Sequence, residues 1–527
     1  MSSFPATIPE LTAEAAHRWP DRPAITCELG NGAITFSELE RRSTAIAGAL
    51  VKRGVKTGDV VAVMLPNRLE FPLLWLAIIK AGAAMAPVNV RYRDSDRNHI
   101  LSHSGAVAFI AEDDNLRTLA GARSLPPGLA WSADIETLVN EAAHTSQPEL
   151  PLVMAHTTAN IQYTSGTTGM PKGCVLSNNY WIRFGECFLR TGPRLTPEDR
   201  VLTAQPFSYA DPQWNVIAAL QSGASLTILE KFSPSRFWQQ VCESQTTFFY
   251  CLGAMPSLML QVPPSSFERD HKVRQVLCSG IPRDRHKELE SRFACPWFEA
   301  FGTTETGGDL IVGPEDHDAA LGTGAIGKPV PTKEARALGA DGRPVKQGEV
   351  GQLAIRGLGM MDGYHNDPAA TANAFMAGFY MTGDLVRQDN AGVFYYVGRT
   401  KDMIRRGGEN IAAAEVEAAI ESHPGVALAA CIPVPDDIRG EEVKVFILFK
   451  KSAKRQQPSM GELHEFVSQR IARFKVPRYW EEVEALPMTP SERVEKATLR
   501  ANEPTPPRGE DFADTAQMTK SATAPEK

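Results

Sequence analysis

The chain has 527 residues, with 55 Lys or Arg against 62 Asp or Glu, which gives a formal net charge of −7 at pH 7. This mildly acidic balance argues against sequence-independent nucleic-acid binding, which requires clustered positive charge. Hydrophobic residues make up 43% of the chain and charged residues 22%, values that are typical of globular proteins and argue against a fibrous or globally disordered one.

The chain carries no pattern that predicts a membrane-spanning or secreted protein. Its most apolar run, Leu73 to Ile79, is far shorter than the roughly 20 residues that a bilayer-spanning helix needs. The first residues, MSSFPATIPEL, show no basic region followed by an apolar block, so no secretion signal is expected. The eight cysteines are scattered and form no Cys-x-x-Cys pair, which fits reduced thiols and predicts a cytoplasmic protein.

The first 160 residues alternate between strand-like and helix-like patterns. Residues 60–65 predict a short apolar strand, 72–82 predict a helix, and 84–90 predict the next strand. The same order returns between Val201 and Ala300. This β-α-β order predicts an α/β fold in which helices cover largely parallel sheets.

The character of the chain changes near residue 325. Residues 325–398 are rich in Gly and Pro and contain short strand-like runs, which predict a β-rich subdomain. Residues 403–502 mix both patterns and are long enough for a separate small α+β domain, with a helix expected over 461–474. Residues 503–527 contain one large apolar residue, Phe512, and are predicted to form a disordered tail.

The segment with the clearest chemistry is Tyr163–Gly173, YTSGTTGMPKG. Small residues let a ligand approach the backbone closely, and successive N–H groups and hydroxyls can bind phosphate. Lys172 adds a mobile positive charge. The segment is not a Walker A loop, because Pro171 precedes the lysine and Gly173 follows it. We therefore expect a phosphate-binding loop of a different type.

Four motifs, in chain order, resemble those of the adenylate-forming superfamily, which comprises acyl-CoA ligases, luciferases and the adenylation domains of peptide synthetases. YTSGTTGMPKG resembles its phosphate loop, and FGTTE at Phe301–Glu305 resembles its aromatic-Gly-x-Thr-Glu motif. YMTGDL at Tyr380–Leu385 resembles its Thr-Gly-Asp motif, and GRTKDMIRRGGENI at Gly398–Ile411 resembles its hinge and the loop that follows. The resemblance covers roughly residues 10–500, and within the superfamily the chain most resembles the crotonobetaine/carnitine-CoA ligase branch.

The resemblance implies an AMP-forming acid–CoA ligase that uses ATP, Mg²⁺ and coenzyme A. A carboxylate would attack the α-phosphate of ATP to give an acyl-adenylate and pyrophosphate, and the thiol of coenzyme A would then displace AMP. The resemblance also implies the domain arrangement: an N-terminal AMP-binding domain over residues 1–398, a hinge over 399–402 and a mobile C-terminal domain over 403–502.

The matching motif positions carry the implied roles. Glu305 would bind Mg²⁺, because a hard cation prefers carboxylate and phosphate oxygens, and Thr304 would contact the α-phosphate. Asp384 would accept both ribose hydroxyls, and Arg399 would lie near the ribose and the phosphates. The other implied ATP contacts are Thr164, Ser165, Gly166, Thr167, Thr168, Gly169 and Lys172 for the phosphates, and Ser279, Gly280, Ile281, Ala300, Phe301 and Gly302 around the adenine, with Thr303 beside them.

The resemblance also assigns roles to the segment after Gly398. Lys401 and Asp402 lie where the superfamily changes its backbone angles between two domain arrangements. Gly407 and Gly408 would let the narrow pantetheine arm of coenzyme A pass close to the backbone. Arg406 would meet the phosphates of coenzyme A, or else it belongs to a solvated charge pair with its neighbour.

One motif departs from the superfamily pattern. Relatives usually end with Thr-Pro-x-Gly-Lys, whose lysine bridges the carboxylate and the nucleotide in the first step, whereas this chain reads MTPSERVEKATLR. Arg493 takes the place of that lysine, and Lys496 follows three residues later. The first half-reaction could therefore use Arg493, use Lys496, or run poorly.

The acyl pocket is expected to be built in part from Gln205–Trp214, where Tyr209, Asp211 and Gln213 make the segment unusually polar. A carboxylate at Asp211 would suit a cationic or otherwise polar acid. The alternative is that Asp211 caps the following helix from outside the pocket.

Two other functions stay open at this point. One keeps adenylation but replaces coenzyme A by an amine, a carrier-protein thiol or an inorganic nitrogen compound, and coenzyme A-dependent release of AMP would separate the two. The other is a degenerate nucleotide-binding protein. The expected partner is a small carboxylic acid, with no nucleic acid and no membrane span, and the sequence leaves open whether the chain forms a homodimer.

Overall fold

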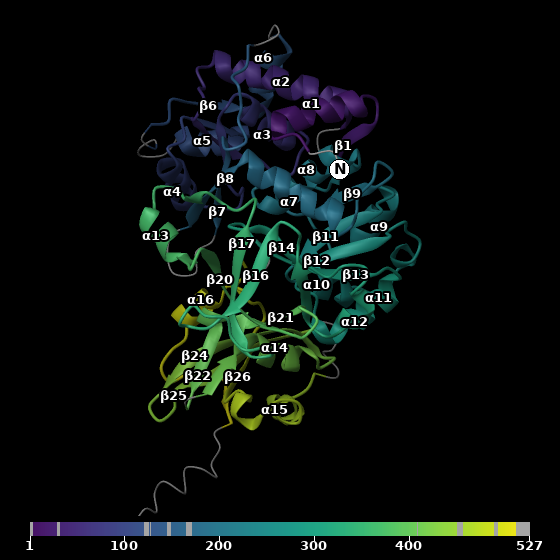
Figure 1. Ribbon diagram of the computed structural model, residues 1–527. Coiled ribbons are helices and arrows are strands. Elements are labelled where there is room, and N and C mark those ends of the chain that lie inside the picture. The colour runs from purple at the N-terminus through teal and green to yellow at the C-terminus, as the bar shows by residue number, and fades with distance from the viewer. Residues whose placement is uncertain are drawn as a thin grey trace, which may run out of the picture.

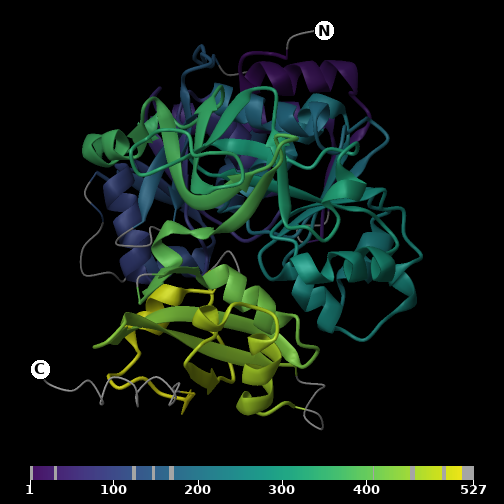
Figure 2. The same ribbon diagram turned by 60° about the horizontal axis from the view of Figure 1, so that its bottom comes forward.

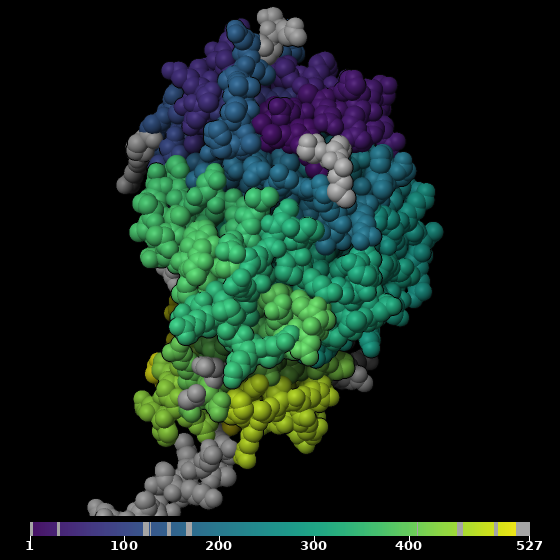
Figure 3. Space-filling model, viewed as in Figure 1, coloured from purple at the N-terminus to yellow at the C-terminus, as the bar shows by residue number. Residues whose placement is uncertain are grey.

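The computed structural model describes residues 4–28, 32–120, 126, 128–144, 149–164, 171–407, 409–450, 457–489 and 494–512. It shows a large domain and a small C-terminal domain, drawn in yellow-green at the bottom of Figure 1. Figure 2 brings the small domain forward and shows that it has a sheet of its own. In the space-filling view of Figure 3 the small domain is a separate lobe below the large one.

Two sheets build the large domain. The first has the strand order β18-β8-β7-β4-β3-β5-β6, and its inner strands are parallel, as the β-α-β order predicts. Its strands are β3 (Val60–Met64), β4 (Ala84–Pro87), β5 (Ala108–Ala111), β6 (Trp131–Asp134), β7 (Thr158–Thr164), β8 (Lys172–Ser177) and β18 (Gly363–Tyr364). Strands β7 and β8 are antiparallel neighbours, so the predicted phosphate loop lies between the two strands of a hairpin in the sequence.

The second sheet runs β16-β17-β20-β21-β15-β14-β13-β12-β11-β9-β10-β1-β2, with β19 beside β20. Its parallel part contains β1 (Pro23–Cys27), β9 (Arg200–Thr203), β10 (Ser225–Ile228), β11 (Phe248–Leu252), β12 (Gln275–Ser279) and β13 (Trp297–Thr303). The antiparallel remainder contains β2 (Gly32–Thr35), β14 (Gly307–Ile311), β15 (Ala325–Pro329), β16 (Lys333–Leu338), β17 (Val350–Gly357), β19 (Phe375–Met376), β20 (Phe379–Gln388) and β21 (Phe394–Arg399). The predicted β-rich subdomain is therefore continuous with the parallel sheet, through β14 and β15.

The small domain has a mixed sheet in the order β23-β22-β25-β26-β27, with β24 beside β25. Its strands are β22 (Met403–Arg406), β23 (Glu409–Ala412), β24 (Val426–Asp436), β25 (Gly440–Phe449), β26 (Tyr479–Glu482) and β27 (Glu510–Asp511). Its helices are α14 (Ala413–Glu421), α15 (Met460–Ser468) and α16 (Lys496–Ala501). Together they form the α+β domain that the sequence predicts for this region.

The helices of the large domain are α1 (Ile8–Arg18), α2 (Phe36–Lys52), α3 (Glu70–Lys80), α4 (Asp94–Ser104), α5 (Asp113–Ala120), α6 (Ile135–Ala143), α7 (Asn178–Arg190), α8 (Ala210–Ser222), α9 (Phe237–Glu243), α10 (Met255–Gln261), α11 (His286–Phe293), α12 (His317–Ala320) and α13 (Pro368–Asn373). Helix α2 begins with a capping box between Thr35 and Glu38, which satisfies the first free backbone donors of the helix. No helix of the described residues is long and apolar enough to cross a membrane.

The apolar run Leu73–Ile79 lies in α3, where every residue from Phe71 to Lys80 is buried. Such a helix has no polar face, because it packs in the interior of the large domain rather than at its surface. The indole N–H of Trp75 donates to Asn160 Oδ1 at 2.9 Å, so the one polar atom of that side chain is satisfied inside the core.

Two predictions for the C-terminal region were wrong in part. Residues 503–512 belong to the fold rather than to a disordered tail: β27 pairs with β26, and the ring of Phe512 stacks on His464 with the centroids 4.7 Å apart. Residues 513–527 lie outside the described residues. The helix expected over 461–474 ends at Ser468, and the chain continues through a turn before a short 3-10 segment, Arg473–Lys475.

Candidate active site

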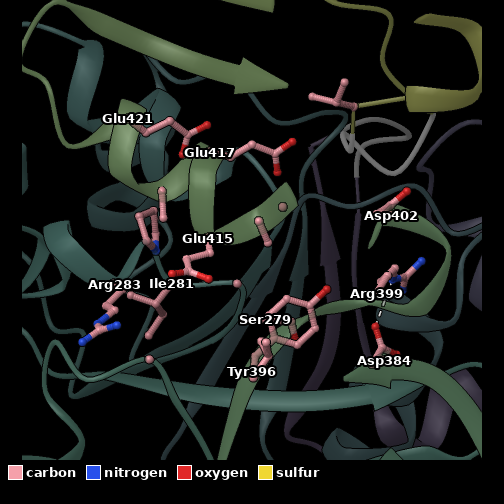
Figure 4. Close-up of a pocket in the computed structure, with 18 of the residues that line it drawn as sticks. Ser279, Ile281, Arg283, Asp384, Tyr396, Arg399, Asp402, Glu415, Glu417 and Glu421 are labelled. Carbon is pink, nitrogen blue, oxygen red and sulfur yellow. Dashed lines mark hydrogen bonds and ion pairs between the residues drawn. The ribbon is translucent and has the colours of Figure 1, made fainter. Parts of the chain in front are cut away.

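A cavity of about 1210 Å³, which we call cavity 1, opens between the large and small domains. Its walls come from the ends of β12 and β13, from β20 and β21, from the hinge, and from α14 and α16 of the small domain. Figure 4 shows Asp384 and Arg399 on one side of this space, and Glu415, Glu417 and Glu421 of α14 on another. The cavity therefore brings together segments that are far apart in the sequence.

Asp384 and Arg399 form a pair across two strands. They lie directly opposite each other in β20 and β21, and Arg399 Nε donates to Asp384 Oδ1 at 2.9 Å, the dashed line in Figure 4. The Asp384 side chain is only 1% exposed, and a carboxylate so buried keeps its charge only with such a partner. Both residues line cavity 1, as the predicted ribose and phosphate contacts should.

The predicted adenine segment forms another wall of cavity 1, across from Asp384 and Arg399. Ser279 ends β12, and Gly280 and Ile281 follow it. The carboxylate of Glu299 accepts hydrogen bonds from the backbone N–H groups of Gly280 at 2.6 Å and Ile281 at 2.8 Å. Burial raises the pKa of Glu299 to about 8, although the two donors oppose the shift. The loop is thus held by a buried carboxyl that the sequence analysis did not single out. Ala300, Phe301, Gly302 and Thr303 of β13 complete this wall.

The described residues of the predicted phosphate site form a separate group that does not line cavity 1. Lys172 is the first residue of β8, and Thr164 is the last of β7, with the Thr164 hydroxyl 3.5 Å from Lys172 O. Ser165, Gly166, Thr167, Thr168 and Gly169 lie outside the described residues. Thr304 and Glu305 follow β13, and the hydroxyl of Tyr364 donates to Glu305 Oε1 at 3.0 Å. A carboxylate such as that of Glu305 is the kind of oxygen ligand that suits Mg²⁺.

A second cavity of about 240 Å³, cavity 2, lies at the carboxyl ends of parallel strands β3, β4, β9, β10 and β11, the usual position of ligand crevices in such sheets. Tyr209 and Asp211 line it, together with Arg91 and Ser208. Gln213 does not: it is fully buried, and its amide donates to Phe207 O at 2.9 Å. Asp211 lies in the first turn of α8, whose N-cap position is Tyr209.

The hinge residues contact the small domain. Lys401 and Asp402 lie in a 3-10 turn, Thr400–Asp402, and Asp402 Oδ1 accepts from Arg500 of α16 at 2.7 Å. Burial, with the nearby Arg399, lowers the pKa of Lys401 to about 8. Cavity 1 is lined by all four charged residues of this region: Arg399, Lys401, Asp402 and Arg500.

The remaining small-domain predictions have mixed placements. Lys496 lines cavity 1 and forms an ion pair with Glu417 at 2.7 Å, while Arg493 and Gly408 lie outside the described residues. Arg406 does not line cavity 1, because its guanidinium is paired with Glu442 at 2.6 Å inside the small domain. Gly407 has φ of +58° in the turn between β22 and β23, a conformation that favours glycine.

One further group has the residue types of a metal site. His286, Glu290 and His317 place three donor atoms within 4.8 Å of one another. However, His286 Nε2 lies 2.8 Å from Trp297 O and Nδ1 accepts from Gly322 N–H, while Glu290 Oε1 accepts from Trp297 N–H at 2.6 Å. These hydrogen bonds occupy the atoms that a metal would need, so we assign the group a structural role between α11 and β13.

Comparison with known proteins places these features in a family. The AMP-binding enzyme model matches residues 12–365, and the AMP-binding enzyme C-terminal domain model matches residues 415–493. The chain is 30% identical to the sulfoacetate–CoA ligase of Cupriavidus necator, over 94% of this chain and 97% of that protein. It is 31% identical to the crotonobetaine/carnitine–CoA ligase of Proteus mirabilis, over 93% of this chain and 98% of that one.

A solved structure shares the fold over a similar length. It is the o-succinylbenzoate coenzyme A synthetase of Bacillus subtilis in complex with ATP and magnesium ion, with a TM-score of 0.82, 26% identity, and coverage of 93% of this chain and 99% of that one. The match of both family models, in the order in which the two domains follow each other here, leads to one conclusion: the chain belongs to the AMP-binding, adenylate-forming enzyme superfamily.

Proposed function

We propose that the protein is an AMP-forming acid–CoA ligase. A carboxylate attacks the α-phosphate of ATP and displaces pyrophosphate, and the thiol of coenzyme A then attacks the acyl carbonyl of the adenylate and displaces AMP. The observation that carries the proposal is cavity 1, where the Asp384–Arg399 pair of the large domain faces Lys496 and Arg500 of the small one. A site closed by two domains suits two chemical steps, because one domain can be rearranged between them.

The residues divide the work of the first step. Asp384 is the acceptor for the ribose hydroxyls, and Arg399 holds that carboxylate in place through its hydrogen bond. Ser279 to Ile281, fixed by Glu299, form the surface for the adenine. Lys172 and Glu305 bind the charged end of the nucleotide. Mg²⁺, held by Glu305, would supply positive charge to the phosphates that leave.

The acid occupies cavity 2, where Tyr209 and Asp211 contact it. The volume of about 240 Å³ is below the range for drug-sized ligands, about 300–1,000 Å³, so the acid is small. Asp211 and Glu230 give the cavity two acidic groups, and Arg91 and Lys231 give it two basic ones, which favours an acid that carries a polar or charged group at the end remote from its carboxylate.

The experiment separates the two half-reactions. Small acids of equal length, with a cationic, an anionic or an uncharged end, are tested for acid-dependent pyrophosphate release by the wild-type protein and by Asp211→Asn. We expect the variant to raise the KM of the charged acid that the enzyme prefers by about tenfold or more, because a hydrogen bond to a charged group is lost, and to change the uncharged acid less. Asp341→Asn, at an exposed turn, is the matched control.

The second half-reaction tells whether cavity 2 holds the acid. Thioester formation from preformed adenylate is measured in Asp211→Asn and in Tyr209→Leu. If both variants leave pyrophosphate release intact and slow only this step, cavity 2 receives the arm of coenzyme A, and our assignment of the acid is wrong.

A further inference from the structure

Residues 361–365 connect the two motifs that form the phosphate end of the site. The backbone N–H of Met361 donates to Glu305 O at 2.8 Å, and the N–H of His365 donates to Gly173 O at 2.7 Å. Between these contacts, Tyr364 lies opposite Cys174 where β18 pairs with β8. Residues 361–365 therefore connect the chain after Thr304 to the strand that begins at Lys172.

The side chain of Tyr364 contacts both charged groups. Its hydroxyl donates to Glu305 Oε1 at 3.0 Å, and Lys172 Nζ lies 5.0 Å from the centroid of its ring. The ammonium therefore interacts with the ring face, while the carboxylate interacts with the hydroxyl. Among the described residues no ion pair joins Lys172 to Glu305, so the two groups meet through Tyr364 rather than in direct contact.

A second tyrosine supports the first. The hydroxyls of Tyr364 and Tyr380 are 3.1 Å apart, and the Tyr380 side chain is buried against the ring of Phe375. A phenol has a single proton to donate. Because Tyr364 gives its proton to Glu305, Tyr380 must be the donor in the contact between the two hydroxyls. The resulting chain, Tyr380 to Tyr364 to Glu305, leaves the hydroxyl of Tyr364 little freedom to turn away.

We propose that Tyr364 is a positioning residue, which holds the Glu305 carboxylate and the Lys172 ammonium a fixed distance apart across the phosphate end of the active site. The proposal rests on the roles given to Glu305 and Lys172 in the proposed function. A carboxylate that is oriented by a hydrogen bond binds a metal better than one that is free to rotate. An ammonium on the face of a ring stays available to a phosphate, whereas one paired with a carboxylate does not.

Equilibrium binding of ATP in the absence of acid tests the proposal without turnover. Affinity is measured calorimetrically with Mg²⁺ and with a chelator, in the wild-type protein, Tyr364→Phe and Tyr364→Leu. Tyr364→Phe removes the donor to Glu305 but keeps the ring, so we expect the gain in affinity caused by Mg²⁺ to fall by about tenfold or more. Metal-free ATP, measured with the chelator, should bind to this variant as it does to the wild type. Tyr364→Leu also removes the ring, so metal-free ATP should bind to it about two- to fivefold more weakly than to the wild type.

Two further variants make each result decisive. Tyr479→Phe removes a hydroxyl from another tyrosine that has a cation over its ring, Arg478 at 4.8 Å, in the small domain, and we expect it to match the wild type. Glu305→Gln should lose the Mg²⁺-dependent gain. Suppose that Glu305→Gln loses this gain while Tyr364→Phe keeps it in full, or binds ATP more weakly by the same factor with and without Mg²⁺. The positioning role of Tyr364 is then overturned, and the role of Glu305 stands. If Glu305→Gln itself keeps the gain, the role of Glu305 in the proposed function fails, and the positioning role fails with it.

Discussion

Lys496 is one of two residues that could supply the cation of the first half-reaction, and its contacts limit it to another task. Its ammonium is 2.7 Å from Glu417, and both side chains are 15% exposed. To reach a nucleotide it would have to leave a largely buried carboxylate unpaired, which is costly. The pair instead joins α16 to α14 on the wall of cavity 1. We therefore propose Arg493 as the cation that the small domain brings to the phosphates.

Arg493→Ala should slow acid-dependent pyrophosphate release by about 30- to 1000-fold, because one charged contact in the transition state is lost. Conversion of preformed adenylate to thioester should be largely spared. Lys496→Ala should lower the melting temperature of the protein more than Arg493→Ala does, because it leaves Glu417 unpaired. The opposite pattern, with pyrophosphate release intact in Arg493→Ala and abolished in Lys496→Ala at a temperature where both are folded, would transfer the role to Lys496.

The sequence identifies some site residues and not others, for a physical reason. Asp384 and Glu305 stand in short motifs whose residue types follow from the chemistry of ribose and of metal ions. Tyr364 is 59 positions from the carboxylate to which it donates, and Glu299 is 18 positions from Ile281. Such contacts depend on how β18 and β13 are placed in their sheets, and no local spacing encodes that.

At the scale of elements, long periodic segments are predicted well and short ones are not. The helix expected over 72–82 and the strands expected over 60–65 and 84–90 are α3, β3 and β4, with small shifts at their ends. Strand β18 has two residues, too few to show any alternation, so nothing in the sequence indicated that it would extend the first sheet. The expected helix at 461–474 ended early although its apolar spacing continued.

The loop between β12 and η2 (Arg283–Arg285) depends on the protonation of Glu299, which gives a pH prediction. The pKa of Glu299 is about 8 in the folded protein, above its ordinary value of 4.5, because burial disfavours the charged form. Between these values the folded state holds the additional proton. The resulting stability is fully present below pH 4.5 and is lost as pH rises through about 8.

Urea unfolding of the wild-type protein and of Glu299→Gln between pH 5 and 9 measures this contribution. We expect the free energy of unfolding of the wild type, minus that of the variant, to decrease steadily as pH rises. Glu421→Gln in α14, where burial also raises the pKa of the replaced carboxyl to about 8, should show the same trend independently in the small domain. A difference that stays constant over the whole range would mean that Glu299 does not change its charge there.

At the scale of the molecule, the β-α-β order predicted the helix-covered sheets, which the strand orders confirm. The motifs predicted the family, which the two family models confirm. The sequence did not show that the β-rich segment continues the parallel sheet, because pairing between β14 and β15 is a long-range contact. The cytoplasmic location stays a prediction, and whether the chain forms a homodimer stays open.

The hinge is a property of the whole molecule and can be tested through it. Asp402→Pro fixes φ near −65°, so it should restrict rotation of the small domain and change the two half-reactions by unequal factors. The same substitution also removes the carboxylate that binds Arg500. Asp402→Asn is the control for that loss, because it weakens the ion pair and leaves the backbone free. If both half-reactions fall equally in the proline variant while the protein stays folded, the account of a hinge at Lys401 and Asp402 is wrong.

We expect one site to carry out adenylation and then thioester formation. The most direct measurement incubates the wild-type protein with ATP, Mg²⁺ and a panel of small carboxylic acids, and follows pyrophosphate, AMP and acyl-CoA with and without coenzyme A. We expect a preferred acid to give pyrophosphate in the presence of ATP, and coenzyme A then to produce AMP and acyl-CoA in equal amounts. Acid-dependent pyrophosphate without any acyl-CoA, or AMP release that coenzyme A does not change, would contradict it.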